Sequence, residues 1–197
     1  MKQASYFCSF LICLLLSAGC SRVPMADIEI AYPQTTDFDS YKTFNLYSAE
    51  VPKPRVGGSG PQYNSLLDQY VRQSIGAEMR KSGFQLDVVA PDLLVAYDIA
   101  VDTSKASSAG YKFPQGFGYG YSFWYGYRFR YDTSTLFDFR PIDELPAGTL
   151  VIDIIDPATN ELLWRCYADA YLDPSTQDEE YVKLVVEDIL SEFPPAS

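Results

Sequence analysis

Two apolar runs near the end of the chain constrain its fold more than any other feature. Residues 148–156 and 161–172 each have the composition of a strand, and the segment between them, Pro157-Ala158-Thr159-Asn160, is typical of a turn. The short connection makes the two strands antiparallel partners. Because one hairpin cannot bury its own apolar face, further strands and helices must pack beside and over it.

The second strand of this hairpin carries small side chains at the centre of one face. Strand alternation places the following residues on that face: Leu162, Trp164, Cys166, Ala168, Ala170 and Leu172. Small residues there predict that a helix packs closely against the strand. We therefore expect Cys166 in the core. The alternative is a reactive thiol, but the chain has no histidine to activate one.

The first of two predicted helices follows residue 64. Apolar residues recur at every fourth position from Leu67 to Met79, which is the spacing of a helix with one buried side. Ser65 together with Asp68 can cap its start, and Gly83 stands where a left-handed C-cap is expected.

The second predicted helix lies at the end of the chain. Ser175 is expected to cap it, the acidic residues 178–180 suit the positive end of its dipole, and Pro194-Pro195 ends it. Its apolar stripe consists of Val182, Val185, Ile189 and Phe193.

Further strands are predicted over residues 41–47, 84–89 and 92–103. In the last of these, one face is apolar and consists of Leu93, Val95, Tyr97, Ile99 and Val101, as expected for a half-buried strand. Strands outnumber helices and their connections are mostly short. The predicted fold class is therefore α+β, a mainly antiparallel β-sheet with two helices packed on one face.

The N-terminus has the features of a bacterial targeting segment. Lys2 precedes an apolar run from Tyr6 to Leu16, which is too short to span a bilayer. The following residues, Ser17-Ala18-Gly19-Cys20, resemble the lipobox of bacterial lipoproteins, in which the cysteine is acylated and becomes the mature N-terminus. The alternative is an ordinary secretory signal in which Cys20 has no role.

The lipobox interpretation divides the chain into three parts. Residues 1–19 are the signal peptide, residues 20–40 are a lipidated tether with one short strand around Ile28 and Ile30, and residues 41–197 form a single domain. Acyl chains on Cys20 would hold the protein in the membrane. Ser21 after the cysteine resembles outer-membrane sorting, so the expected location is the outer membrane, facing the periplasm. Cys166 is then the single cysteine of the mature domain, which excludes an internal disulfide.

Composition excludes several classes of function. The absence of histidine removes Ser-His-Asp and Cys-His nucleophiles and every histidine-bearing metal site. The chain has 26 acidic and 15 basic residues, a net charge of −11, so we expect no nucleic-acid partner. Because it also has no phosphate-binding glycine loop and no zinc spacing, no cofactor and no metal are expected.

Several short motifs, in this order, resemble one family of bacterial lipoproteins, catalogued as domain of unknown function 4136. They are Asp37-Phe38-Asp39-Ser40-Tyr41-Lys42-Thr43-Phe44, Ser82-Gly83-Phe84, Pro91-Asp92-Leu93-Leu94-Val95-Ala96-Tyr97, Gly148-Thr149-Leu150-Val151-Ile152-Asp153, Asp156, Leu163-Trp164-Arg165 and Phe193-Pro194-Pro195. The resemblance implies an envelope lipoprotein with an α+β domain and no established catalytic residues. Where that family tends to have glycine after the Trp-Arg pair, this chain has Cys166.

Carboxylates are the main catalytic groups that the sequence offers. Three sets can be drawn as the acid/base pair of a glycosidase: Asp153 with Asp156, Asp37 with Asp39, and Asp138 with Asp143 and Glu144. Solvated turns and strand ends explain the same residues, so no catalytic residue is predicted.

Residues 111–131 have an unusual pattern. Every odd position from Phe117 to Tyr131 is aromatic, and the stretch from Thr103 to Tyr131 has no acidic residue. Its basic residues are Lys105, Lys112, Arg128 and Arg130. The candidate binding surface in this segment consists of Tyr119, Tyr121, Trp124, Arg128 and Arg130.

Three interpretations of this segment stay open. The aromatic residues can cover the second face of the sheet, they can bind envelope glycan or another anionic polymer, or they can contact a protein or a membrane surface. The function expected from the sequence is that of a non-enzymatic outer-membrane lipoprotein, an envelope binding or scaffolding module. The alternative is a glycan-active hydrolase that uses paired carboxylates.

Overall fold

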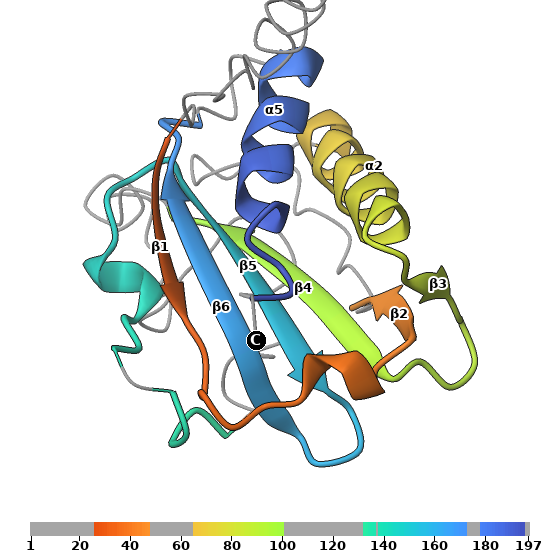
Figure 1. The fold of residues 1–197 in the computed structure, drawn as a ribbon. Coiled ribbons are helices and arrows are strands. Elements are labelled where there is room, and N and C mark those ends of the chain that lie inside the picture. The colour runs from red at the N-terminus through yellow and green to blue at the C-terminus, as the bar shows by residue number, and fades with distance from the viewer. Residues whose placement is uncertain (1–25, 48–64, 101–131, 137, 173–177, 196–197) are drawn as a thin grey trace, which may run out of the picture.

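The structure is a computed structural model that describes residues 26–47, 65–100, 132–136, 138–172 and 178–195. These residues form a six-stranded sheet in the order β1-β6-β5-β4-β2-β3, with two α-helices on one face (Figure 1). The strands are β1 Asp27–Ala31, β2 Thr43–Leu46, β3 Gln85–Leu86, β4 Leu93–Ile99, β5 Thr149–Asp156 and β6 Glu161–Asp169. The helices are α2 Ser65–Lys81 and α5 Glu179–Leu190, and two short 3-10 helices are η2 Phe38–Ser40 and η4 Ile142–Glu144.

The predicted α+β class is confirmed, with one refinement of the sheet. β1, β6, β5 and β4 pair in antiparallel fashion, whereas β2 runs parallel to both β3 and β4, so the sheet is mixed. The chain passes through α2 between β2 and β3, and a helical crossover returns the next strand in the same direction. The short strand predicted around Ile28 and Ile30 is β1, so the sheet includes part of the segment assigned to the tether.

The predicted hairpin is β5 and β6, but its register contains a bulge. Ile155 pairs with Leu162 and Ile154 pairs with Trp164, which leaves Leu163 as an extra residue. The prediction that Leu162 shares a face with Trp164 is therefore wrong. Leu162 packs on the face away from the helices, with Ala31 and Ile155, because the extra residue inverts the alternation at that point.

Both helices cover the face of the sheet to which Trp164 points. The stripe of α2 from Leu67 to Met79 and the residues Val182, Val185 and Ile189 of α5 are fully buried in one core cluster. Gly83 has a φ of 96° and ends α2 as predicted: its N–H donates to Arg80 O, and the N–H of Phe84 donates to Met79 O.

The cap of the last helix differs from the prediction. The carboxylate of Asp178 accepts hydrogen bonds from the N–H groups of Glu180 and Tyr181, so Asp178, and not Ser175, caps α5. A carboxylate at this position satisfies two free N–H groups and also suits the positive end of the helix dipole.

The second face of the sheet is buried as well. β4 was expected to be half-buried, yet Ala96, Asp98 and Ala100 on its outer face are all inaccessible. Among the described residues, Phe139, Ile142 and Leu145 pack over this face and explain part of the burial. The segment before β5 therefore folds back across the sheet, which strand alternation by itself does not predict.

Cys166 lies in the main core cluster with no exposed surface, as predicted. Burial raises the pKa of its thiol far above the ordinary value, so the thiol stays protonated.

A thiol reagent should therefore label the native protein slowly and label it fast only in denaturant. Cys166→Gly should still fold, and the lost side chain and added backbone freedom should lower the free energy of unfolding by no more than about 1–2 kcal/mol. Labelling kinetics and urea unfolding measure both effects. Rapid labelling of the native protein would contradict the core position.

Candidate functional site

The candidate residues of the aromatic segment, Tyr119, Tyr121, Trp124, Arg128 and Arg130, lie outside the described residues, as does the lipidation site Cys20. Their roles stay predictions. Most of the candidate carboxylates lie within the described residues, and the structure gives several of them a structural partner.

Asp153 forms a buried ion pair. Its two carboxylate oxygens accept hydrogen bonds from Nε and Nη2 of Arg165, both at 2.7 Å, and each side chain is 1% exposed. Arg165 also donates to the carbonyl oxygen of Arg140 at 3.1 Å and lies over the ring of Phe139, 4.4 Å from its centroid. Because the guanidinium occupies both oxygens, Asp153 is held as a structural anion and does not face Asp156 as a catalytic partner.

Asp156 and Asp37 shape turns. Asp156 accepts the N–H groups of Ala158 and Thr159, at 2.7 and 3.3 Å, and the hydroxyl of Tyr41 at 3.3 Å. Burial, followed by the nearby Asp156 carboxylate, raises the pKa of Tyr41 to about 12. Asp37 caps η2 by accepting the N–H of Asp39 at 3.1 Å. Within the part of the chain that the structure describes, no group of three Asp, Glu or Cys side chains could hold a metal ion.

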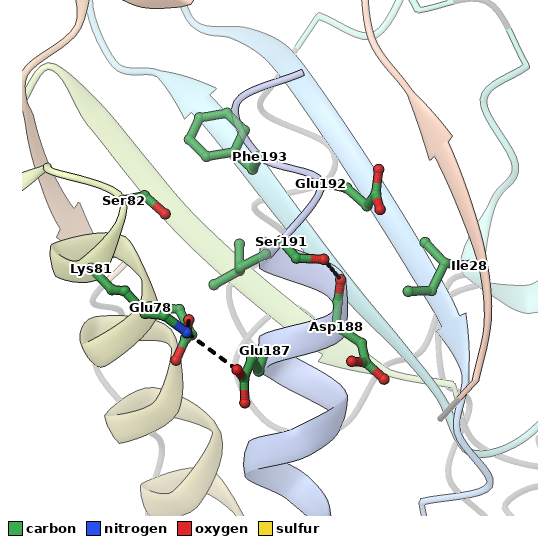
Figure 2. Close-up of a pocket in the computed structure, with 10 residues that line it drawn as sticks. Ile28, Glu78, Lys81, Ser82, Glu187, Asp188, Ser191, Glu192 and Phe193 are labelled. Carbon is green, nitrogen blue, oxygen red and sulfur yellow. Dashed lines mark hydrogen bonds and ion pairs between the residues drawn. The ribbon is translucent and has the colours of Figure 1, made fainter. Parts of the chain in front are cut away.

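A cavity lies at the C-terminal ends of α2 and α5, and Ile28 of β1 is among the residues that line it. Figure 2 shows this end groove, which has a volume of about 410 Å³. Its lining residues are Ile28, Glu78, Lys81, Ser82, Glu187, Asp188, Leu190, Ser191, Glu192 and Phe193. Residues from three distant parts of the sequence therefore meet there.

One ion-pair bridge joins the two helices across the end groove. Lys81 Nζ lies 3.1 Å from Glu78 Oε2 on its own helix and 3.2 Å from Glu187 Oε1 on α5. The hydrogen bond to Glu78 and, to a smaller extent, the hydrogen bond to Glu187 raise the pKa of Lys81, so the lysine stays charged at neutral pH.

The end groove has an excess of negative charge. Its described lining residues include four carboxylates and one ammonium group, and Asp188 and Glu192 lie on the side toward Ile28 (Figure 2). Both helices also direct their C-terminal, partially negative ends toward it. The end groove therefore favours positively charged groups over anions.

The amino-acid sequence does not indicate the end groove. Glu78 and Glu187 are ordinary polar positions on their helices, and nothing local in the sequence indicates that the helices end side by side. The one local indication is Pro194-Pro195, which prevents α5 from continuing. It thereby limits where the C-terminal end of α5, which borders the end groove, can lie.

A second cavity of about 340 Å³ lies at the C-terminal tail, against the segment that joins β1 to η2. It is lined by Tyr32, Gln34, Thr36, Asp37, Phe38, Asp39, Pro194 and Pro195, and we call it the tail pocket. It combines aromatic and proline walls with hydroxyl, amide and carboxylate groups.

No helix among the described residues has both the length and the apolar character needed to cross a membrane.

The sequence and the fold are both similar to known proteins. A family model described as Domain of unknown function (DUF4136) matches residues 28–195. A DUF4136 family protein from Bacteroides thetaiotaomicron is 14% identical with a TM-score of 0.54, and the match covers 87% of this chain and 97% of that one. A PDZ domain protein from Parabacteroides distasonis is 20% identical, with a TM-score of 0.50. That match covers 87% of this chain but only 36% of the PDZ domain protein. At these identities the structural likeness concerns the fold alone. A comparison with curated protein sequences found no match.

Proposed function

The chain belongs to the DUF4136 family, whose function is unknown, and from that premise we propose that it is a non-enzymatic lipoprotein whose domain binds or scaffolds a partner in the bacterial envelope. In this proposal Cys20 is acylated and anchors the protein in the outer membrane, with the domain facing the periplasm.

One observation carries the non-enzymatic part of the proposal. A carboxylate hydrolase needs two acids that face one another across a cleft, one of them free to take up and release a proton. In the described part of the chain, Asp153 is held by Arg165, Asp156 by a turn and Tyr41, and Asp37 by η2. This arrangement supports a binding role over the hydrolase alternative.

The lipid anchor is supported by the sequence alone. Small residues precede Cys20, and the apolar run before them is too short to cross a bilayer. Lys2 places a positive charge ahead of that apolar run, as in signal peptides.

The end groove is the described surface best suited to contact a partner protein. It is recessed, it carries a fixed charge pattern, and its rim residue Glu192 is exposed. A partner with a basic surface segment would match its negative charge.

A photo-crosslinking amino acid in place of Glu192, in the full-length protein within the envelope, should give a distinct protein adduct on irradiation. The same amino acid in place of Thr159, which is exposed in the β5–β6 turn, is the matched control and should give several-fold less of that adduct. Mass spectrometry of the adduct identifies the partner. Equal adducts from both positions, or none from Glu192, would remove the end groove from the proposal.

A further inference from the structure

We infer that the tail pocket binds one pyranose unit of a neutral or amino-bearing glycan. The inference deepens the proposed function and rests on it only for the envelope source of the glycan. With about 340 Å³, the pocket lies in the size range of small-molecule sites, roughly 300–1,000 Å³.

One wall of the tail pocket is aromatic, and side chains of the core pack against it. The ring of Tyr32 is partly exposed and meets Phe38 edge to face, with centroids 6.4 Å apart and an interplanar angle of 65°. Phe38 is buried and meets Phe193 in the same way at 5.3 Å. Phe193 in turn packs against Trp164 of the core, with centroids 5.3 Å apart. A pyranose presents a face of C–H groups, and such a face packs well on an aromatic ring that is already fixed.

The polar groups of the pocket are suited to sugar hydroxyls. The side chains of Gln34, Thr36 and Asp39 line it and make no hydrogen bond to another described residue. Asp37 uses Oδ1 to accept the N–H of Asp39. An amide, a hydroxyl and a carboxylate together provide donors and acceptors, and adjacent hydroxyls of a sugar need both.

The backbone that carries Asp37 and Asp39 is held by hydrogen bonds within the protein. Ser40 Oγ donates to Asp37 O at 2.8 Å, and Lys42 Nζ donates to Asp39 O at 2.6 Å, so η2 is fastened at both ends. Because this order is already present in the protein, little conformational entropy would be lost on binding.

Charge selects the class of sugar. Asp37 and Asp39 line the tail pocket, no basic residue is among its described lining residues, and the chain has a net charge of −11. An acidic sugar unit would bring a further negative charge beside these two carboxylates, whereas a neutral unit would not and an amine would be attracted. The tail pocket therefore differs from the cationic surface predicted around Arg128 and Arg130, which would select anionic polymers.

The test is isothermal titration calorimetry on the detergent-purified full-length protein. The neutral probe is a trimer of N-acetylglucosamine, and the acidic probe is a trimer of galacturonate. The neutral trimer should bind and the acidic trimer should not. Absence of binding by the neutral trimer, or tighter binding of the acidic one, overturns the inference.

Three tyrosine variants locate the site. Tyr32→Ala should weaken binding of the neutral trimer about tenfold, since one aromatic contact is removed, while Tyr32→Phe should keep most of the affinity. Tyr171→Ala is the matched control, because Tyr171 is 78% exposed and does not line the pocket. Thermal unfolding of each variant checks that the domain is folded, and an equal loss in Tyr32→Ala and Tyr171→Ala overturns the assignment.

The Asp39 variants provide a second, independent test. Asp39→Asn keeps a hydrogen-bonding side chain and should retain most of the binding, whereas Asp39→Ala should weaken it several-fold. These binding measurements use purified protein and do not depend on membrane anchoring or on the crosslinked partner. A failure of the sugar-binding inference can therefore be distinguished from a failure of the proposed function.

Discussion

Replacing Arg165 by methionine should lower the free energy of unfolding by about 3–5 kcal/mol, because it leaves the Asp153 carboxylate buried without its counter-charge. Methionine keeps most of the volume of the side chain, so little of the loss comes from a cavity. The variant also removes the hydrogen bond to Arg140 O and the contact with Phe139, which fasten the segment before η4 over the sheet.

Two further variants distinguish an ion-pair effect from general damage. Asp153→Leu combined with Arg165→Met should recover most of the lost stability, since an apolar pair replaces both buried charges. Arg140→Met is the matched control: its partner Glu29 lies at 3.2 Å but is largely exposed, so the expected loss is less than about 1 kcal/mol. Urea unfolding with comparable slopes measures all of them. If the double variant were as unstable as Arg165→Met, the buried charge would not be the cause.

Replacing Cys20 by serine should move nearly all of the protein from the membrane to the soluble periplasmic fraction, with its signal peptide cut at another site. The hydroxyl of serine does not replace the thiol that receives the lipid, and the acyl chains supply the membrane affinity, about 0.8 kcal/mol for each buried CH₂ group. Cell fractionation followed by a carbonate wash measures the change.

Cys13→Ser is the matched control for this experiment. Cys13 lies in the same N-terminal segment but outside the lipobox, so this variant should stay in the membrane like the parent protein. Retention of Cys20→Ser after the carbonate wash would show that the lipobox interpretation is wrong. It would leave the proposed contacts at the end groove and the tail pocket to be judged by their own tests.

The sequence by itself determined the elements whose signals are local. The four-residue recurrence of α2, the left-handed turn at Gly83 and the hairpin of β5 and β6 all depend on neighbours within a few positions, where backbone geometry dictates the pattern. The burial of Cys166 was predicted for the same reason, since strand alternation places it between Trp164 and Ala168.

The tertiary structure decided which charged groups meet. With an unbroken register from the pair of Asp156 and Glu161, Asp153 would lie opposite Trp164. The extra residue Leu163 shifts the strand by one position, so that Asp153 pairs with Arg165 instead. One bulge therefore converts a candidate catalytic acid into half of a buried ion pair, and local composition does not determine where a strand will bulge.

Both cavities also depend on contacts between distant parts of the chain. Lys81 and Glu187 form the bridge of the end groove although they are 106 positions apart in the sequence. Asp37 and Pro194 line the same pocket because their neighbours Phe38 and Phe193 pack together in the core. Such pairings are set by how whole elements pack on the sheet, which is a property of the completed core and not of any short stretch of sequence.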